Sequence, residues 1–124
     1  TLRVSLGSTA PAGGLSEVVL GLALAGPYVT RTNVLVFAPA GGALTGATLD
    51  GAPAELGTGS ERGRRVGVVT VDLTPGATKV LEMTLLTRDT RTGPATVAPR
   101  LWTTPLARSW ATTVGSAVRC GRIG

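Results

Sequence analysis

Catalytic chemistry in this chain has to come from carboxylates or a thiol, because its 124 residues include no histidine. That excludes Ser-His-Asp and Cys-His systems and most catalytic zinc sites, since each depends on an imidazole. Glu55 and Glu61 could form the acid and base pair of a glycosidase, and Asp89 is a further carboxylate that a hydrolase fragment could use. No aromatic residue flanks the two glutamates to bind a sugar. We therefore expect solvated loop carboxylates and no catalytic residue.

Arg62, Arg64 and Arg65 form the densest basic group in the sequence. A planar guanidinium fork suits phosphate or carboxylate partners, so these three arginines are the candidate binding residues, with an anionic polymer as the ligand class. The alternative is an ordinary solvated start of a strand. Nucleic acid is not the expected partner, because its readers add aromatic side chains among the basic ones, and this chain has four aromatic residues in all.

Other reactive side chains occur singly. Cys120 is the one cysteine, which excludes an internal disulfide and a zinc cluster built from cysteines, and we expect a spare or interdomain thiol. Lys79 is the only lysine and Asn33 the only asparagine. Such a pair could form an isopeptide bond, but Lys79 adjoins a turn and is expected to point to water. We predict no cofactor and no metal site.

The composition describes a basic, folded domain. The net charge is +5, with 43% hydrophobic and 15% charged residues, unlike a disordered chain. A basic surface can meet nucleic acid, anionic lipid or an acidic wall polymer, or can simply keep a domain in solution. The longest apolar run, residues 18–25, is shorter than the roughly 18 residues that span a bilayer. The sequence starts at Thr1 without a leader, so we expect a mature fragment or a piece of a longer protein.

Apolar residues that alternate with a period of two dominate the sequence. They are Val69, Val71 and Leu73 before the turn at residues 74–78, and Leu81, Met83 and Leu85 after it. This period is typical of half-buried strands and predicts two adjacent antiparallel strands. Residues 2–6 alternate in the same way, and further short runs follow at spacings of roughly eight to twelve residues. The predicted fold class is all-β, an antiparallel Ig-like β-sandwich of about seven to eight strands.

Two segments are ambiguous. Residues 16–25 could form a helix capped by Ser16, but their apolar residues also alternate, and we favour a strand because Gly21 weakens a helix. Residues 28–37 predict a strand that ends in Val34, Leu35, Val36 and Phe37. That ending is apolar on both faces, as expected for a central strand covered on both sides or a strand at a sandwich edge.

The remaining elements follow from turn residues. Asp50 and Gly51 predict a tight hairpin turn, and Pro53 keeps the returning strand, residues 52–56, short and near an edge. Residues 57–63 are expected to form a polar loop, and residues 95–103 a seventh strand interrupted by Pro99. We predict a sandwich domain over residues 1–104 and a C-terminal extension over residues 105–124, either a further strand or a loosely ordered tail.

Several connecting motifs occur in a characteristic order. They are Leu2-Arg3-Val4 with Thr9-Ala10-Pro11, then Arg31-Thr32-Asn33 with Phe37-Ala38-Pro39, then Leu49-Asp50-Gly51, Glu61-Arg62-Gly63-Arg64 and Leu73-Thr74-Pro75-Gly76. This order resembles the C-terminal part of a large uncharacterised family of actinobacterial envelope proteins, a domain of unknown function. The resemblance covers most of residues 1–104. It implies a membrane-anchored protein whose C-terminal module lies outside the cytoplasm, and it transfers no catalytic residue.

The functional expectation combines these observations. We expect a non-catalytic, extracytoplasmic β-sandwich module of a larger cell-envelope protein, acting as a spacer or as an interaction surface. Its partner would be another envelope protein or an anionic wall polymer, and any membrane contact would come from segments outside this chain. The alternatives are an anionic-polymer binding module that uses Arg62, Arg64 and Arg65, and an accessory domain of a hydrolase.

Overall fold

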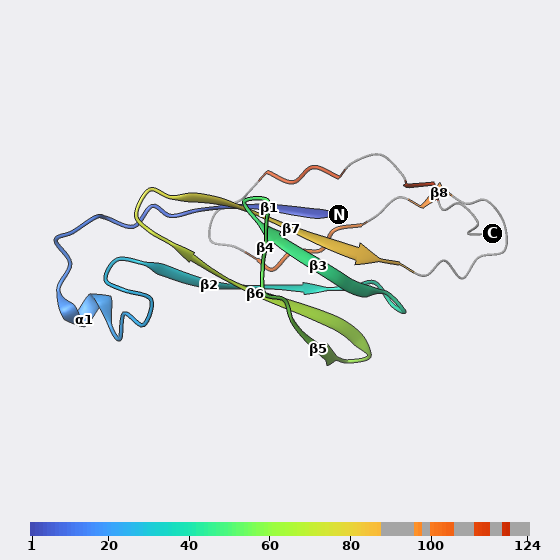
Figure 1. Ribbon diagram of the computed structural model, residues 1–124, viewed down its shortest axis with the longest axis horizontal. Coiled ribbons are helices and arrows are strands. Elements are labelled where there is room, and N and C mark those ends of the chain that lie inside the picture. Colours follow the sequence, from blue (N-terminus) through green and yellow to red (C-terminus); the bar gives the residue numbers. More distant parts are fainter. Residues whose placement is uncertain (88–95, 98–99, 106–110, 115–117, 120–124) are drawn as a thin grey trace. The chain divides into compact units, whose positions relative to one another are not determined.

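Seven strands within the first 87 residues form two antiparallel sheets (Figure 1). The structure is a computed structural model that describes residues 1–87, 96–97, 100–105, 111–114 and 118–119. The four-stranded sheet has the order β1 (Leu2–Gly7), β7 (Thr78–Leu86), β3 (Ala43–Leu49) and β4 (Ala52–Pro53). The three-stranded sheet has the order β2 (Thr30–Phe37), β6 (Arg64–Leu73) and β5 (Gly57–Glu61). The predicted all-β sandwich is confirmed.

The strand neighbours are those of an immunoglobulin-like sandwich with one difference. In that fold, strands B, E and D lie together in one sheet, and strands G, F, C and C′ in the other. Strands β2, β6 and β5 take the places of B, E and D, while β7, β3 and β4 take those of F, C and C′. The first strand, β1, lies beside β7 in the place of G. Among the residues that the structure describes, no strand occupies the place of A beside β2.

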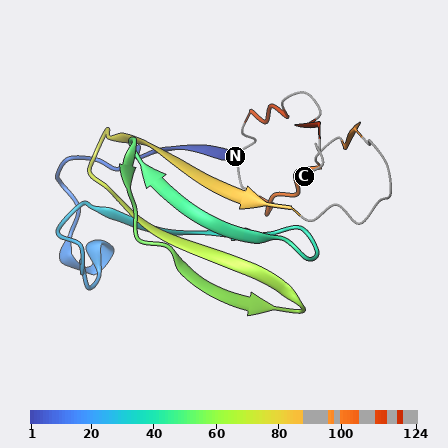
Figure 2. The ribbon, with the colours of Figure 1, turned by 45° about the vertical axis from the view of Figure 1, so that its right-hand side comes forward.

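The core forms where β6 and β7 face each other. Val71, Leu81 and Met83 have no exposed surface, and Val69 is 2% exposed. These strands follow each other in the chain but belong to different sheets, so the prediction that they are adjacent antiparallel neighbours is wrong. If β6 and β7 paired in one sheet, their apolar side chains would lie on the same face and would need another layer to cover them. Because the turn between them crosses from one sheet to the other, the apolar face of each strand covers that of the other. Figure 2 shows these two layers of the sandwich.

The predicted Asp-Gly hairpin is confirmed. Asp50 and Gly51 connect β3 with β4 at φ values of 51° and 82°, the left-handed conformations that a tight hairpin turn requires. Asp50 also ties this turn to β7. Its backbone N–H donates to the carbonyl oxygen of Val80, and its Oδ1 accepts from the Val80 N–H, both at 2.8 Å. The returning strand is short and lies at a sheet edge, as the position of Pro53 predicts.

Two segments differ from their predictions. The strand favoured for residues 16–25 is wrong, because Glu17–Leu20 form one helical turn, α1, which ends at Gly21 with a φ of 60°. The polar loop predicted for residues 57–63 is also wrong, because Gly57–Glu61 form β5. All five residues of β5 are exposed. An edge strand that pairs only through its backbone needs no apolar side chain, so the alternation of apolar residues contains no sign of it.

The chain divides into two compact units, Thr1–Arg88 and Asp89–Gly124. In the second unit, Thr96–Val97 (β8) pair with Val118–Arg119 (β9), and the guanidinium of Arg100 lies 5.9 Å from the ring centre of Trp102. Of the predicted strand at residues 95–103, the structure describes the two residues of β8 and an irregular stretch from residue 100. Residues 95 and 98–99 lie outside the described residues, and the predicted domain boundary after Thr104 stays a prediction.

Substituting Asp50 with Ala should lower the free energy of unfolding by about 1–2 kcal/mol. The change removes the acceptor for the Val80 N–H and places a residue with little tolerance for a positive φ at the turn. Urea denaturation measures the loss. Asp50→Asn is the matched control, since it keeps a side-chain oxygen and tolerates the same φ, and it should lose clearly less. Equal losses would contradict the role of the carboxylate oxygen.

Candidate functional site

The outer face of the three-stranded sheet changes from polar to apolar along β2. Val34 and Val36 pack with the core. The alternate residues Arg31, Asn33, Leu35 and Phe37 therefore project from the other side of the strand, and all four are exposed. Their partners on β6 are Asp72, Thr70, Val68 and Val66, respectively. Each pair lies on the same face of the sheet, since directly opposed residues do so.

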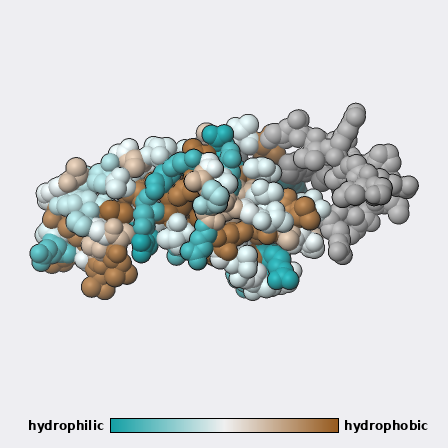
Figure 3. Space-filling view, in the orientation of Figure 1, coloured by the Kyte–Doolittle hydropathy of each residue, from teal (hydrophilic) through white to brown (hydrophobic). Residues whose placement is uncertain are grey.

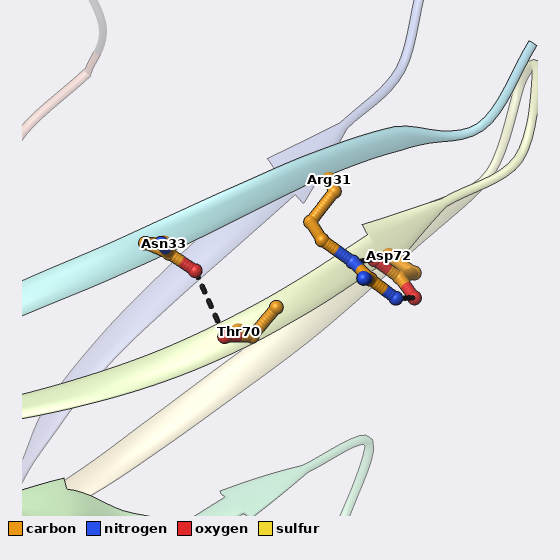
Figure 4. Close-up of polar contacts among 4 residues, drawn as sticks. All are labelled: Arg31, Asn33, Thr70 and Asp72. Carbon is orange, nitrogen blue, oxygen red and sulfur yellow. Dashed lines mark hydrogen bonds and ion pairs between the residues drawn. The ribbon is translucent and has the colours of Figure 1, made fainter. Parts of the chain in front are cut away.

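The polar end consists of two cross-strand pairs (Figure 4). Arg31 donates from Nε to Oδ1 of Asp72 and from Nη2 to Oδ2, both at 2.7 Å, so the ion pair is bidentate. The Thr70 hydroxyl donates to Oδ1 of Asn33 at 2.8 Å. Hydrogen bonding from Arg31, together with its charge, lowers the pKa of Asp72 below its ordinary value and raises the pKa of Arg31. The charges of Arg31 and Asp72 are thus paired with each other, and so are the Thr70 hydroxyl and the Asn33 side-chain oxygen.

At the apolar end, the two residues of β2 are open to solvent, whereas on β6 Val68 is half-buried and Val66 is only 7% exposed. Leu35 is 53% exposed and Phe37 is 46% exposed. On the next strand, β5, Gly57 lies opposite Val68 and Gly59 opposite Val66. Because these glycines have no side chains, β5 places no side chain directly beside the two valines. We call Leu35, Phe37, Val66 and Val68 the apolar outer face.

The outer face of the four-stranded sheet is mainly polar, apart from Leu86 at the end of β7, which is 63% exposed. Arg3 on β1 lies opposite Glu82 on β7, and Nη1 of Arg3 is 3.4 Å from Oε1 of Glu82. Ser5 and Thr84 project from the same face and are exposed. The two outer faces differ, because Leu35 and Phe37 lie together on β2, whereas Leu86 is a single large exposed apolar side chain on the described part of the other face. The pair on β2 therefore marks its face as the candidate surface for contact.

The three candidate arginines lie at the β5–β6 hairpin but not on one face. Arg62 occupies the turn with a φ of 48°, followed by Gly63 at 74°. Arg64 and Arg65 are the first two residues of β6, and successive strand residues point to opposite faces. Arg64 shares the outer face with Val66 and donates from Nη1 to the Ala38 carbonyl at 3.4 Å. Arg62 and Arg64 thus border the apolar outer face, whereas Arg65 faces away from it.

The other candidate residues are not brought together. Glu55 precedes β5 and Glu61 ends it, so the extended strand alone separates them by more than about 13 Å, beyond the spacing of a glycosidase pair. Asn33 projects from the outer face of the three-stranded sheet, where it accepts from Thr70, and Lys79 lies in the other sheet, so the two side chains do not meet in an isopeptide pair. Asp89 and Cys120 lie outside the described residues. Within the described ranges, no three His, Cys, Asp or Glu side chains gather to hold a metal ion.

The segment of chain that connects β1 with β2 forms a second exposed apolar surface. The sequence patterns did not predict this surface. Val18 is 92% exposed, Leu22 88% and Leu24 85%. Figure 3 shows brown side chains gathered at the lower left, over α1 and the turns that follow it. For the exposed Leu35 and Phe37, the sequence did hold a signal, because residues 34–37 are apolar on both faces while the strand lies at an edge.

Comparison of the chain with protein-family models, with curated proteins and with solved structures found no match. Within the described residues, no helix is long and apolar enough to cross a membrane.

Replacing Arg31 with Gln should raise the pKa of Asp72 toward its ordinary value, because the carboxylate loses its bidentate partner. In the native protein, the lowered pKa contributes stability that is present above the ordinary Asp pKa and is lost as the pH falls through the lowered value. NMR titration of the Asp72 carboxyl carbon measures the shift. Arg3→Gln removes the Arg3–Glu82 pair instead and should leave the Asp72 titration unchanged. An unshifted Asp72 in Arg31→Gln would contradict the assignment.

Proposed function

We propose that this chain is a non-catalytic protein-interaction module that binds another protein through the apolar outer face. The observation that carries the proposal is the exposure of Leu35 and Phe37 side by side on one face of an edge strand. Burying an exposed apolar side chain releases free energy at roughly 25 cal/mol per Å² of buried apolar surface, so a partner gains from covering these two residues.

The composition of this surface supports the proposal. Protein interfaces combine an apolar or aromatic centre with a polar rim, and arginine is enriched in them. Here Phe37 and Leu35 form the centre, and Arg62 and Arg64 form the rim on one side. The glycines of β5 add no side chains to this surface, so that a partner with a flat surface can approach it closely.

The path of the chain favours an interaction surface over a spacer. Leu2 at the start of β1 lies opposite Met83 near the end of β7. The chain thus enters and leaves the sandwich at the same end, on strands about 5 Å apart. A spacer adds length when its two ends lie far apart, and this module would add little.

The cellular setting of the proposal comes from the sequence. The resemblance to actinobacterial envelope proteins suggests a module outside the cytoplasm, and the partner is then another envelope protein. The separation of Glu55 from Glu61 argues against a glycosidase pair, while Asp89, the third carboxylate of the hydrolase interpretation, lies outside the described residues. In this proposal, the loops have no catalytic role, and the apolar outer face binds the partner.

A photo-crosslinking side chain tests the proposal directly. Replacing Leu35 or Phe37 with benzoylphenylalanine in the full-length protein, in the cells that make it, should give one discrete protein adduct on illumination. Thr84 is the matched control, because it is also an exposed outward residue but lies on the polar face of the other sheet. Mass spectrometry identifies the adduct. Equal labelling at all three positions, or none, would count against the apolar outer face as the contact surface.

A second candidate function is binding of an anionic polymer. The observation in its favour is Arg62, which holds a positive φ at the hairpin tip where Asn, Asp or Gly would be unstrained. A residue kept in such a conformation is a candidate for selection by function. Arg64 projects from the same end of the sheet, but Arg65 faces away, which limits a joint site to two arginines.

Polyphosphate titration at several salt concentrations separates this candidate from the first. If the arginines bind the polymer, replacing Arg62, Arg64 and Arg65 with Gln should weaken binding and reduce the salt slope by about 1 for each phosphate that is no longer neutralised. A control variant with Gln at Arg3, Arg31 and Arg100 changes the net charge equally, from +5 to +2. Equal weakening in both variants would mean that net charge alone attracts the polymer.

A further inference from the structure

One side of the sandwich is closed and the other is open. On the closed side, residues 54–56 connect β4 in one sheet with β5 in the other, and Ala54 and Leu56 pack against the core. The strands β1 and β2 therefore form the opposite side. Their inward-facing apolar residues there are only half-buried: Leu2, Val4 and Leu6 on β1 and Val34 on β2.

The outer edge of β2 has no described partner strand. Such an edge presents a row of free backbone N–H and C=O groups that can pair with another extended segment. The position corresponds to strand A of the immunoglobulin-like order, which precedes strand B in the chain. The segment that precedes β2 here is therefore in the right place along the chain to fill it.

That segment, residues 18–24, has the length and pattern of the missing strand. Val18, Leu20, Leu22 and Leu24 alternate with Val19, Gly21 and Ala23. Seven extended residues match seven of the eight residues of β2. In the structure, these residues form α1 and turns, with three of the large apolar side chains more than four-fifths exposed. This arrangement leaves apolar surface in water that pairing with β2 would bury.

We propose that residues 18–24 are a strap that closes on the edge of β2 as an eighth strand of the sandwich. A five-residue connection, residues 25–29, places Leu24 opposite Thr30 and Leu20 opposite Val34. Val18, Leu20, Leu22 and Leu24 then join the inward face of β2 and cover the open side of the core. A shift by one residue would turn all four outward, so burial selects this register.

The small residues of the strap fit the outward face in this register. Ala23 lies opposite Arg31 and Gly21 opposite Asn33, where they leave room for the Arg31–Asp72 ion pair. The one charged residue nearby, Glu17, falls on the outward side as well. Closure therefore buries apolar surface without burying a charge.

Tyr28 holds the strap in its open position. The Leu15 N–H donates to the Tyr28 hydroxyl at 3.1 Å, and that hydroxyl donates to the Leu15 carbonyl at 3.4 Å. In the closed register, Leu15 would lie opposite Pro39, nine residues or about 30 Å along the strand from Thr30. Closing must break both hydrogen bonds. Tyr28 itself has a φ of 63°, a strained value for this residue type, in the structure with both hydrogen bonds in place.

Engineered cysteines test the strap and its register. In a Cys120→Ser background, Leu22→Cys with Thr32→Cys should form an intramolecular disulfide under mild oxidation, since opposed residues in antiparallel strands lie within bonding reach. Ala23→Cys with Thr32→Cys is the control, because these side chains point to opposite faces in the proposed register. Adding Tyr28→Phe removes both hydrogen bonds with Leu15 and should speed formation of the first disulfide roughly five- to hundredfold, the effect of losing two hydrogen bonds.

The outcomes separate the alternatives. A monomeric disulfide in the first pair but not the second supports the strap. A disulfide that links two chains would show that the segment pairs with a second copy of the protein. Absence of a disulfide would show that residues 18–24 keep the conformation seen in the structure. Either result overturns the proposal.

If the cysteine variants fail to fold, amide hydrogen exchange provides a second test. The Tyr28→Phe variant should show more protection than the unmodified protein at residues 18–24 and in β2, and unchanged exchange overturns the proposal. This proposal is independent of the partner of the apolar outer face.

Discussion

The contact between β6 and β7 across the interior determines the rest of the sandwich. Val69 and Val71 lie in one sheet and Leu81 and Met83 in the other, and each is almost completely removed from water. Each of the two strands has a neighbour on both sides, β6 between β2 and β5 and β7 between β1 and β3, and of these two sheets only β4, beside β3, pairs with neither. Gly67 shows how close the layers come, because a Cβ at that position would lie 2.7 Å from Leu44 and 3.1 Å from Met83. The fold thus consists of a tight aliphatic centre with less well buried strands around it.

Because the centre is small and filled by aliphatic side chains, the proposed surfaces for recognition lie at the outer faces and edges of the sandwich. The four-stranded sheet presents a mainly polar outer face with Leu86 at one end, while the three-stranded sheet presents Leu35 and Phe37 together beside glycine-rich β5. One side of the sandwich is closed by the link from β4 to β5, and the other has an unpaired β2 edge, among the described residues, next to an exposed apolar segment. The proposed contact face and the proposed strap share β2. Closure would place Val19 beside Leu35 and so extend the apolar outer face by one strand.

The sequence predicted those features that depend on local backbone chemistry or on period-two burial. Asp50 and Gly51 specified their turn because few residues accept a positive φ, and the alternation around Val71 and Leu81 identified the core strands. It could not predict which strands pair, since an alternating pattern indicates the buried face but not the neighbour. The strand β5 was missed because its exposed glycine and polar residues are held by backbone hydrogen bonds alone. The arginines at residues 62–65 are close in the sequence, but the pleat of β6 divides them between two faces.

The position of β1 beside β7 also determines how the sandwich responds to mechanical load. Tension applied through Leu2 and Leu86 pulls apart two neighbouring antiparallel strands from their shared end. The hydrogen bonds between them lie perpendicular to the strands, so they carry the force one pair at a time and open like a zipper, whereas a sheared interface loads all its bonds together. Under such tension, β1 would peel away first and uncover the edge of β7, while the contact of β6 with β7 stays intact. The first step of extension would therefore need less force than shearing the same two strands past each other.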